Sequence, residues 1–279
     1  MQDLQNKVAV ITGGASGIGF AFAQRFASAG MKLVLADVEE DALSSAERLL
    51  ADAGAEVLSV LTDVSVEDQV HRLADETFRR FGTAHVVCNN AGVGPGGVSW
   101  EIPTRVWEWV LGVDLWGVIY GIQAFVPRLV AQNEGHVVNT ASVGGLIGGP
   151  GMGPYEAAKH AVVGLSQSLE HDLRLVNSNV HATVVCPSFT RTRMNDSGRN
   201  WPARYGAAPE SGLEPGHPLL RHRFQDAAAS GSATDPADVA DQVHDAVINN
   251  RFWVLTEDHP EQRLVPHYEG MLEGTLDDS

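Results

Sequence analysis

Cationic side chains are scarce in this chain of 279 residues. Nineteen Lys and Arg face 35 Asp and Glu, which gives a formal net charge of −16 at pH 7. Nucleic acids and anionic membrane surfaces bind basic proteins, so we expect neither as a partner. Only three of the cations are lysines, at positions 7, 32 and 159, and the position of each one is therefore informative.

Cysteine is scarce as well. Cys88 and Cys186 each lie in an apolar run with a strand-like pattern, and they lack C-x-x-C spacing. We expect buried, reduced thiols and no redox site. The 11 His show no H-E-x-x-H or comparable spacing, and the sequence predicts no metal site.

Long apolar runs are missing, although 44% of the residues are hydrophobic. No run reaches the ~18 residues of a membrane-spanning helix, and the N-terminus has neither a basic segment nor a cleavable apolar one. We therefore expect a cytoplasmic protein. Because no repeat or linker divides the chain, residues 1–279 should form a single domain.

Short apolar strands alternate with amphipathic helices along most of the chain. Strands that are apolar throughout, with helices between them, indicate a parallel sheet covered on both faces, so the predicted fold is α/β with three layers. Pro127 should kink the longest helix or begin its last turns. A loop-rich insertion at 188–232 and a tail at 257–279 lie outside this pattern. The strands are expected at 7–12, 32–37, 56–63, 84–89, 136–142, 180–187 and 251–256, and the helices at 20–30, 40–53, 66–81, 104–132, 155–176 and 235–250.

The first strand runs into a glycine-rich loop, GGASGIG at 13–19, which opens a helix. Such glycines let the backbone approach a pyrophosphate, and a helix N-terminus favours its negative charge. The loop alone could be a tight turn, but the flanking elements and a second strand ending in Asp37 favour a dinucleotide site. Asp37 can accept both hydroxyls of an adenosine ribose and would repel a 2′-phosphate. Val38, Glu39 and Glu40 follow it, so no cation is near in the sequence, and the prediction is NAD.

Polar or small residues also follow the other strands. Each of them could be turn or cap chemistry. Their joint occurrence at successive strand ends, where parallel sheets bind ligands, instead favours one extended site. They are Asp63 and Val64, the run Asn89 to Gly92, Ser142, and the segment from Pro187 onward.

Tyr155 and Lys159 are four residues apart at the start of a helical pattern, which puts both side chains on one helix face. A phenol titrates near ~10, too high for a base at neutral pH, but an adjacent ammonium lowers the phenol pKa. The pair can then exchange a proton near pH 7.

Taken together, these residues resemble the short-chain dehydrogenases/reductases over nearly the whole chain, to about residue 256. The motifs that carry the resemblance are TGGASGIG at 12–19, Asp63-Val64, Asn89-Asn90-Ala91-Gly92, Ser142, Tyr155-x-x-x-Lys159, and Pro187 followed by Thr190 and Thr192. The resemblance implies a Rossmann-type, doubly wound sheet of seven parallel strands. It also implies a dimer or tetramer, to which the broad apolar stripes of the 104–132 and 155–176 helices are suited.

The resemblance further assigns roles to residues. Tyr155 would be the general acid/base, Ser142 would polarise the substrate oxygen, and Lys159 would hold the nicotinamide ribose and lower the tyrosine pKa. Asp114 completes the implied catalytic group. The implied cofactor-binding residues are Gly13, Ser16, Gly17, Ile18, Gly19, Asp37, Asp63, Val64, Asn90, Gly92, Tyr155, Lys159, Thr190 and Thr192.

The chain departs from the family pattern at two positions. Asp114 stands where the family usually has Asn, which supports a water linked to the active-site lysine; activity should survive with an altered pH profile. Ser188 replaces the glycine that usually follows the proline. The segment 199–206 is similar to a loop of dehydrogenases that act on aryl-substituted secondary alcohols, such as lignin-type Cα-dehydrogenases.

The residues expected around the substrate are mostly apolar or aromatic, and no lysine is available to bind a carboxylate or phosphate. Arginines at 191, 193, 199 and 204 keep an anionic substrate possible, although we expect them to face solvent or pair with acids. The insertion at 188–232 should form a lid or a disordered loop. The residues expected to line the substrate site are Ser142, Val143, Pro150, Met152, Phe189 and Met194, with Val93, Gly149, Trp201 and Tyr205 beside them.

The predicted function is NAD-dependent interconversion of a bulky hydrophobic secondary alcohol and its ketone. Three alternatives stand beside it. A dinucleotide-sensing protein without turnover would typically lack Tyr155 or Lys159. A lyase or epimerase that uses bound NAD would usually have a longer chain. A reductase could instead act on a polar or carrier-linked ketone.

Overall fold

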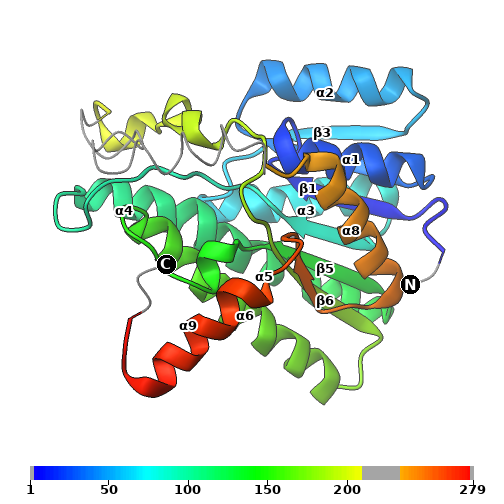
Figure 1. Cartoon of the computed structure of the whole chain (residues 1–279). Helices are drawn as coiled ribbons and strands as arrows, with labels where there is room; N and C mark the ends of the chain where they lie inside the picture. The colour runs from blue at the N-terminus through cyan, green and yellow to red at the C-terminus, as the bar shows by residue number, and fades with distance from the viewer. Residues whose placement is uncertain (1–2, 209–232, 277–279) are drawn as a thin grey trace.

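Seven parallel strands form one sheet in the order β3-β2-β1-β4-β5-β6-β7. The computed structural model describes residues 3–208 and 233–276 (Figure 1). The predicted parallel sheet is confirmed, with most strands a little shorter than the sequence pattern indicated. The strands are β1 (Val8–Thr12), β2 (Lys32–Asp37), β3 (Val57–Leu61), β4 (Val86–Asn89), β5 (Gly135–Thr140), β6 (Val180–Cys186) and β7 (Trp253–Leu255).

Helices cover both faces of the sheet, as the uniformly apolar strands predict (Figure 1). Alternate residues of β1 point to opposite faces: Val8 and Val10 join one buried cluster, while Ala9 and Ile11 join another. The first cluster is covered by α3 (Glu67–Phe81), α4 (Thr104–Leu111), α5 (Gly117–Gln132) and α6 (Gly153–Leu175), and the second by α1 (Gly17–Ser28), α2 (Glu40–Asp52) and α8 (Pro236–Asn249).

The expected single helix at 104–132 contains a π-helical turn at Gly112–Trp116, between α4 and α5. Pro127 lies inside α5. By length and mean hydropathy (1.5), Thr104–Gln132 could cross a membrane, and it is the one such helix in the described part of the chain. Half of that apolar window is buried inside the protein.

Two segments outside the sheet pattern have structure of their own. The presumed tail contains a helix, α9 (Glu261–Glu273), which the sequence analysis missed. Its Leu264 packs against a buried cluster that includes Leu146 and Val163. In the insertion, residues 194–200 and 203–205 form short 3-10 helices, whereas 209–232 lie outside the described residues.

Candidate active site

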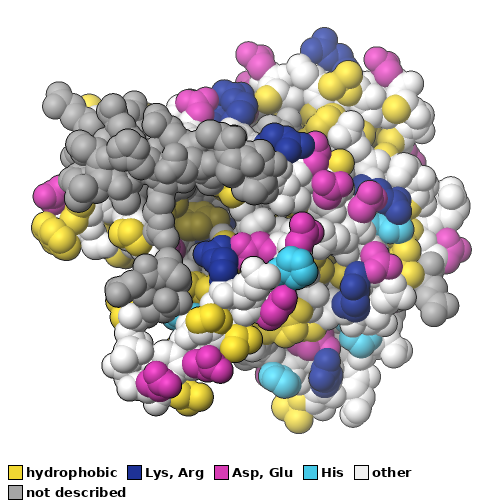
Figure 2. Space-filling view, in the orientation of Figure 1, with side chains coloured by type: hydrophobic (Ala, Val, Ile, Leu, Met, Phe, Trp, Pro, Cys, Tyr) yellow, Lys and Arg dark blue, Asp and Glu magenta, His cyan; other side chains and the backbone are white. Residues whose placement is uncertain are grey.

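A large pocket follows the carboxyl ends of the strands, where doubly wound sheets bind ligands. Its volume is about 1250 Å³. Figure 2 shows a hollow with a hydrophobic floor on the left of the molecule, the side to which these strand ends point. The pocket is lined by every residue that the family resemblance assigned to the cofactor, and by Ser142, Val143, Pro150, Met152, Phe189 and Met194 at its substrate end. Asp114 is the exception among the site residues, because it lies buried behind the wall.

Ser142, Tyr155 and Lys159 meet on one wall of the pocket. Ser142 lies two residues after the end of β5, and Tyr155 and Lys159 lie on successive turns of α6. The Ser142 hydroxyl lies close enough to the Tyr155 phenol to lower its pKa. Lys159 Nζ lies 5.5 Å from the centre of the Tyr155 ring and donates a hydrogen bond of 3.0 Å to the Thr140 carbonyl oxygen. The predicted pair therefore shares one site with the predicted serine.

Asp114 contacts Lys159 from the buried side, away from the pocket. It sits in the π-helical turn, fully buried, with Oδ2 3.2 Å from Lys159 Nζ. Its Oδ1 accepts a hydrogen bond of 2.9 Å from the Val93 N–H. Such local π-helical geometry is frequent at functional sites. Here it turns the carboxyl group toward the lysine, so an acid stands where the family has a neutral amide. Burial raises the pKa of Asp114, while Lys159 and the Val93 N–H limit that rise.

The charges of this group compete with burial. Burial alone would lower the pKa of Lys159, but Asp114 and Tyr155 together outweigh it and raise that pKa, so the lysine stays protonated. Burial raises the pKa of Tyr155, while Lys159 and the Ser142 hydrogen bond pull it down and Asp114 raises it further. In the protein without cofactor, the sum of these effects raises the pKa of Tyr155 above its ordinary value. Lys159 acts on the phenol as predicted, but it does not by itself lower the tyrosine pKa below its ordinary value.

The glycine loop forms a cradle that larger residues would fill. Gly17 has φ +53°, a conformation that favours glycine. A Cβ at Gly19 would lie only 2.1 Å from the Gly13 carbonyl oxygen. The N-terminus of α1 begins here at Ser16 and carries no side-chain cap, so its N–H groups can receive a phosphate. This cradle fits the pyrophosphate of a dinucleotide.

Two carboxylates flank the far end of the cradle. Asp37 ends β2; its Oδ2 accepts the Ala15 N–H (3.1 Å), and its Oδ1 accepts the N–H groups of Val38 and Glu39 (2.8 and 3.1 Å). Burial raises its pKa, and these hydrogen bonds limit the rise. Burial would also raise the pKa of Asp63, but hydrogen bonds from Ser65 and Arg204 turn the net shift downward.

Arginines from the insertion reach this end of the pocket, which the sequence analysis did not anticipate. Arg199 pairs with Glu39 (Nη2–Oε1 2.5 Å), and Arg193 Nη1 lies 3.9 Å from Glu39 Oε2. Arg204 pairs with Asp63 at 2.7 Å. The expectation that the arginines would pair with acids is confirmed at these positions. The sequence near Asp37 offers no cation, but in space Arg199 pairs with Glu39, two residues after Asp37.

The substrate end of the pocket is largely apolar. Val93, Val143, Gly149, Pro150, Met152, Phe189 and Met194 line it as predicted, whereas Trp201 and Tyr205 are absent from the described lining. Trp201 packs edge-on against Trp109, with ring centroids 5.2 Å apart. Arg263 of the unpredicted helix α9 does reach the pocket, paired with Glu257 at 2.6 Å.

Ser188, the other departure from the family pattern, ties its loop to the edge of the sheet. Its N–H donates to Thr256 Oγ1 (3.0 Å), and its hydroxyl lies 3.3 Å from Thr234 Oγ1. Thr190 also forms a bridge with Thr234. The serine therefore fixes the start of the segment that carries Phe189 and Thr190.

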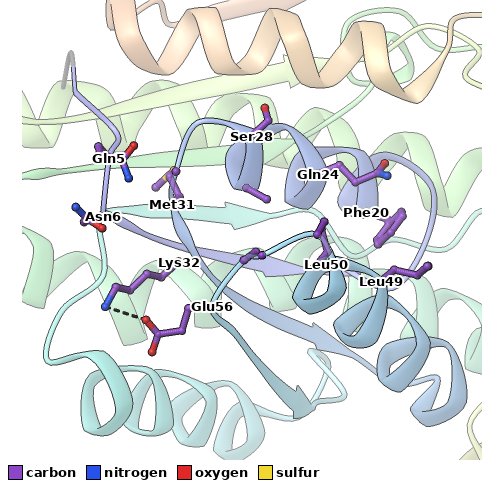
Figure 3. Close-up of a pocket in the computed structure, with 15 residues that line it drawn as sticks. Gln5, Asn6, Phe20, Gln24, Ser28, Met31, Lys32, Leu49, Leu50 and Glu56 are labelled. Atoms are coloured by element: carbon purple, nitrogen blue, oxygen red, sulfur yellow. Dashed lines mark ion pairs between the residues drawn. The ribbon is translucent and has the colours of Figure 1, made fainter.

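A second pocket lies between α1 and α2 and has a volume of about 560 Å³ (Figure 3). Phe20, Leu49 and Met31 form its apolar part. Its charged groups, Lys32 and Glu56, neutralise each other at 2.9 Å. It therefore lacks the convergent reactive groups of the large pocket.

Comparisons with known proteins agree with this geometry. The family model for short chain dehydrogenases matches residues 7–203. The chain is 36% identical over 265 residues to a 1-deoxy-11-beta-hydroxypentalenate dehydrogenase of Streptomyces avermitilis, covering 94% of this chain and 88% of that protein. It is 31% identical over 279 residues to a C alpha-dehydrogenase of Sphingobium sp. SYK-6, covering 98% and 88%.

A solved structure is similar over the whole chain. A short-chain dehydrogenase/reductase from Burkholderia phymatum, in complex with NAD, has a TM-score of 0.93 and 42% identity, covering 100% of this chain and 99% of that one. This neighbour and the glycine cradle support a nicotinamide dinucleotide as the cofactor. The chain belongs to the short-chain dehydrogenase/reductase family of oxidoreductases.

Proposed function

We propose that this protein is an NAD-dependent dehydrogenase that interconverts a bulky, hydrophobic secondary alcohol and its ketone. The observation that carries the proposal is the Tyr155 phenol, which lies beside the Ser142 hydroxyl and the Lys159 ammonium on the wall of a pocket that also contains the glycine cradle. A binding protein without turnover would have no use for this group.

In the oxidative direction, the Tyr155 oxygen takes the proton of the substrate hydroxyl as the carbinol carbon becomes a carbonyl. Ser142 donates a hydrogen bond to the substrate oxygen and so fixes its position beside the phenol. Lys159 favours the phenolate by its charge. A nicotinamide dinucleotide held by the glycine cradle and Asp37 would supply the hydride acceptor for the carbinol carbon and a further positive charge near the phenol. In the reductive direction, Tyr155 returns the proton to the oxygen.

The preference for NAD rests on Asp37. Three backbone N–H groups hold its carboxylate in place beside the cradle, where it can accept hydrogen bonds from both ribose hydroxyls. A 2′-phosphate at the same place would meet a negative charge. The NAD found in the Burkholderia phymatum neighbour agrees with this assignment.

The preference for an apolar substrate rests on the lining near Tyr155. Val143, Pro150, Met152, Phe189 and Met194 present few polar groups to a ligand. The two relatives are named as dehydrogenases, one of them of a hydroxypentalenate, which supports an alcohol as the substrate. The best-supported class is therefore an aryl-alkyl or cyclic alcohol.

The direct test is an assay of NADH absorbance with a panel of aryl-alkyl and cyclic secondary alcohols, including polyols and hydroxy acids for comparison. We expect NADH in proportion to the ketone formed, with the apolar alcohols used most efficiently. Binding of NAD⁺ without turnover on any alcohol or ketone would contradict the proposal and favour the sensing alternative.

A further inference from the structure

Glu39 is the centre of an ion-pair cluster at the ribose end of the pocket. Its Oε1 accepts hydrogen bonds from Arg199 Nε (3.0 Å) and Nη2 (2.5 Å) and from Asn200 Nδ2 (3.1 Å). Arg193 Nη1 lies 3.9 Å from the other carboxylate oxygen. The Arg199 contact holds the pKa of Glu39 below its ordinary value, so this carboxylate is charged at neutral pH.

The cluster lies beside the group that should receive the cofactor ribose. Glu39 is two residues from Asp37, and its own N–H donates to Asp37 Oδ1 at 3.1 Å. Asp37, Glu39, Arg193 and Arg199 all line the large pocket. A 2′-phosphate is attached to that same ribose, so it would enter the pocket at this corner.

Arg199 does not depend on Glu39 for its position. Its Nη1 also donates to the carbonyl oxygens of Arg193 (3.1 Å) and Asp196 (2.8 Å). The guanidinium is therefore held by its own loop, and only about a fifth of the side chain is exposed (21%). If Glu39 lost its charge, Arg199 would remain in the pocket as a cation whose remaining carboxylate contact is the long one to Asp196 of its own loop, with Nη1 and Oδ2 3.8 Å apart.

We propose that Glu39 is a second specificity-determining residue for the cofactor. By pairing with Arg199, it withholds from a 2′-phosphate a guanidinium group that is suited to bind it. Arg193, 3.9 Å from Glu39, is paired more closely with Asp196 at 3.0 Å. The inference rests on the proposed function, because it takes Asp37 as the residue that receives the ribose. Two effects then weaken the binding of NADP⁺: the negative charge of Asp37 repels its 2′-phosphate, and Glu39 neutralises the nearby arginine that could bind that phosphate.

The test measures the dissociation constants of NAD⁺ and NADP⁺ by titration calorimetry, without substrate or turnover. Glu39→Gln keeps the shape of the side chain and removes its charge. Glu40→Gln is the matched control, since it makes the same charge change one residue away, at an exposed position in the first turn of α2. The double variant Glu39→Gln/Arg199→Ala removes the released cation as well.

Glu39→Gln should tighten NADP⁺ binding by about tenfold at low salt, because a like charge is removed and a cation is released. NAD⁺ binding should change far less, and Glu40→Gln should leave both constants near the parent values. The gain should shrink as salt is added and should be lost in the double variant. An unchanged NADP⁺ constant in Glu39→Gln, or a full gain that persists in the double variant, would overturn the proposal.

The same measurements separate this inference from the proposed function. If the parent binds NAD⁺ and Glu39→Gln gains nothing toward NADP⁺, only the role of Glu39 is wrong. If the parent protein binds neither NAD⁺ nor NADP⁺, that result contradicts the proposed function itself. Equal weakening of both cofactors in Glu39→Gln would show that Glu39 merely anchors the loop, and would also overturn the proposal.

Discussion

Asp114 and Lys159 form a buried ion pair, with Oδ2 and Nζ 3.2 Å apart, directly behind the tyrosine of the active site. The family usually places a neutral Asn at this position. An anion here partly cancels the positive charge that favours the Tyr155 phenolate, and it raises the pKa of that phenol. Asp114 touches no reacting atom, so it acts through Lys159 as a positioning residue.

Asp114→Asn should therefore move the acid limb of the pH profile for alcohol oxidation to lower pH. Removal of the anion lets Lys159 lower the Tyr155 pKa more effectively, so the phenolate that accepts the proton forms at lower pH. The measurement is kcat/KM for oxidation against pH. Asp172→Asn, at an exposed position on α6, should leave the profile unchanged. A shift of the limb to higher pH would mean that Lys159 loses its proton without Asp114.

Tyr155→Phe removes only the phenol oxygen that carries the proton. Turnover should fall by at least ~10²-fold, the usual contribution of general acid/base catalysis, while NAD⁺ binding stays nearly intact. Steady-state kinetics and a calorimetric titration measure the two effects separately. Tyr268→Phe, on the exposed side of α9, is the matched control. If Tyr155→Phe retains wild-type turnover, Tyr155 is not the general acid/base.

Much of this fold could be predicted because each strand carries its own signal. Apolar runs such as 180–187 have the length and composition of a strand buried on both faces of a sheet. In a parallel sheet, the carboxyl ends of all strands lie at the same edge. Asp37, Asn90 and Ser142 therefore had to approach one another wherever the strand order followed the usual doubly wound pattern. Their common position in one pocket needs no long-range contact beyond the sheet itself.

The contacts that were missed come from segments without such a pattern. Arg199 reaches Glu39 only because the insertion folds back to the residues that follow β2, and nothing in the local sequence specifies that return. Helix α9 has no buried residue and a proline at 266, so its sequence gave a weak helical signal. The π-helical turn at 112–116 likewise interrupts a pattern that reads as one continuous helix.

The protein should assemble as a dimer or tetramer through α5 and α6. Apolar side chains remain exposed at these helices: Trp116 is 48% exposed, and Leu175 at the end of α6 is 80% exposed. Light scattering at micromolar concentration should report an oligomer, and Trp116→Glu should raise its dissociation constant by about tenfold or more, as for an aromatic hot spot. Trp100→Glu changes an equally apolar residue outside these helices, 86% exposed, and should have no effect. A monomeric parent protein would refute this assembly.

The apolar lining near Tyr155 predicts how the enzyme should respond to substrate size. Burial of each added methylene contributes up to ~0.8 kcal/mol, so kcat/KM should rise by up to about fourfold per carbon along a series of alkyl aryl ketones. The rise should stop where the pocket is full. Met194 sets part of that limit, because its side chain fills the space in front of Gly94, where a Cβ would meet its Cγ at 3.1 Å. Met194→Ala should therefore move the plateau to longer ketones and lower the efficiency of the short ones. If kcat/KM is flat or falls along the series, or if a polyol or hydroxy acid is used better than every apolar ketone, the pocket selects for polar groups and Arg263 becomes the first residue to test.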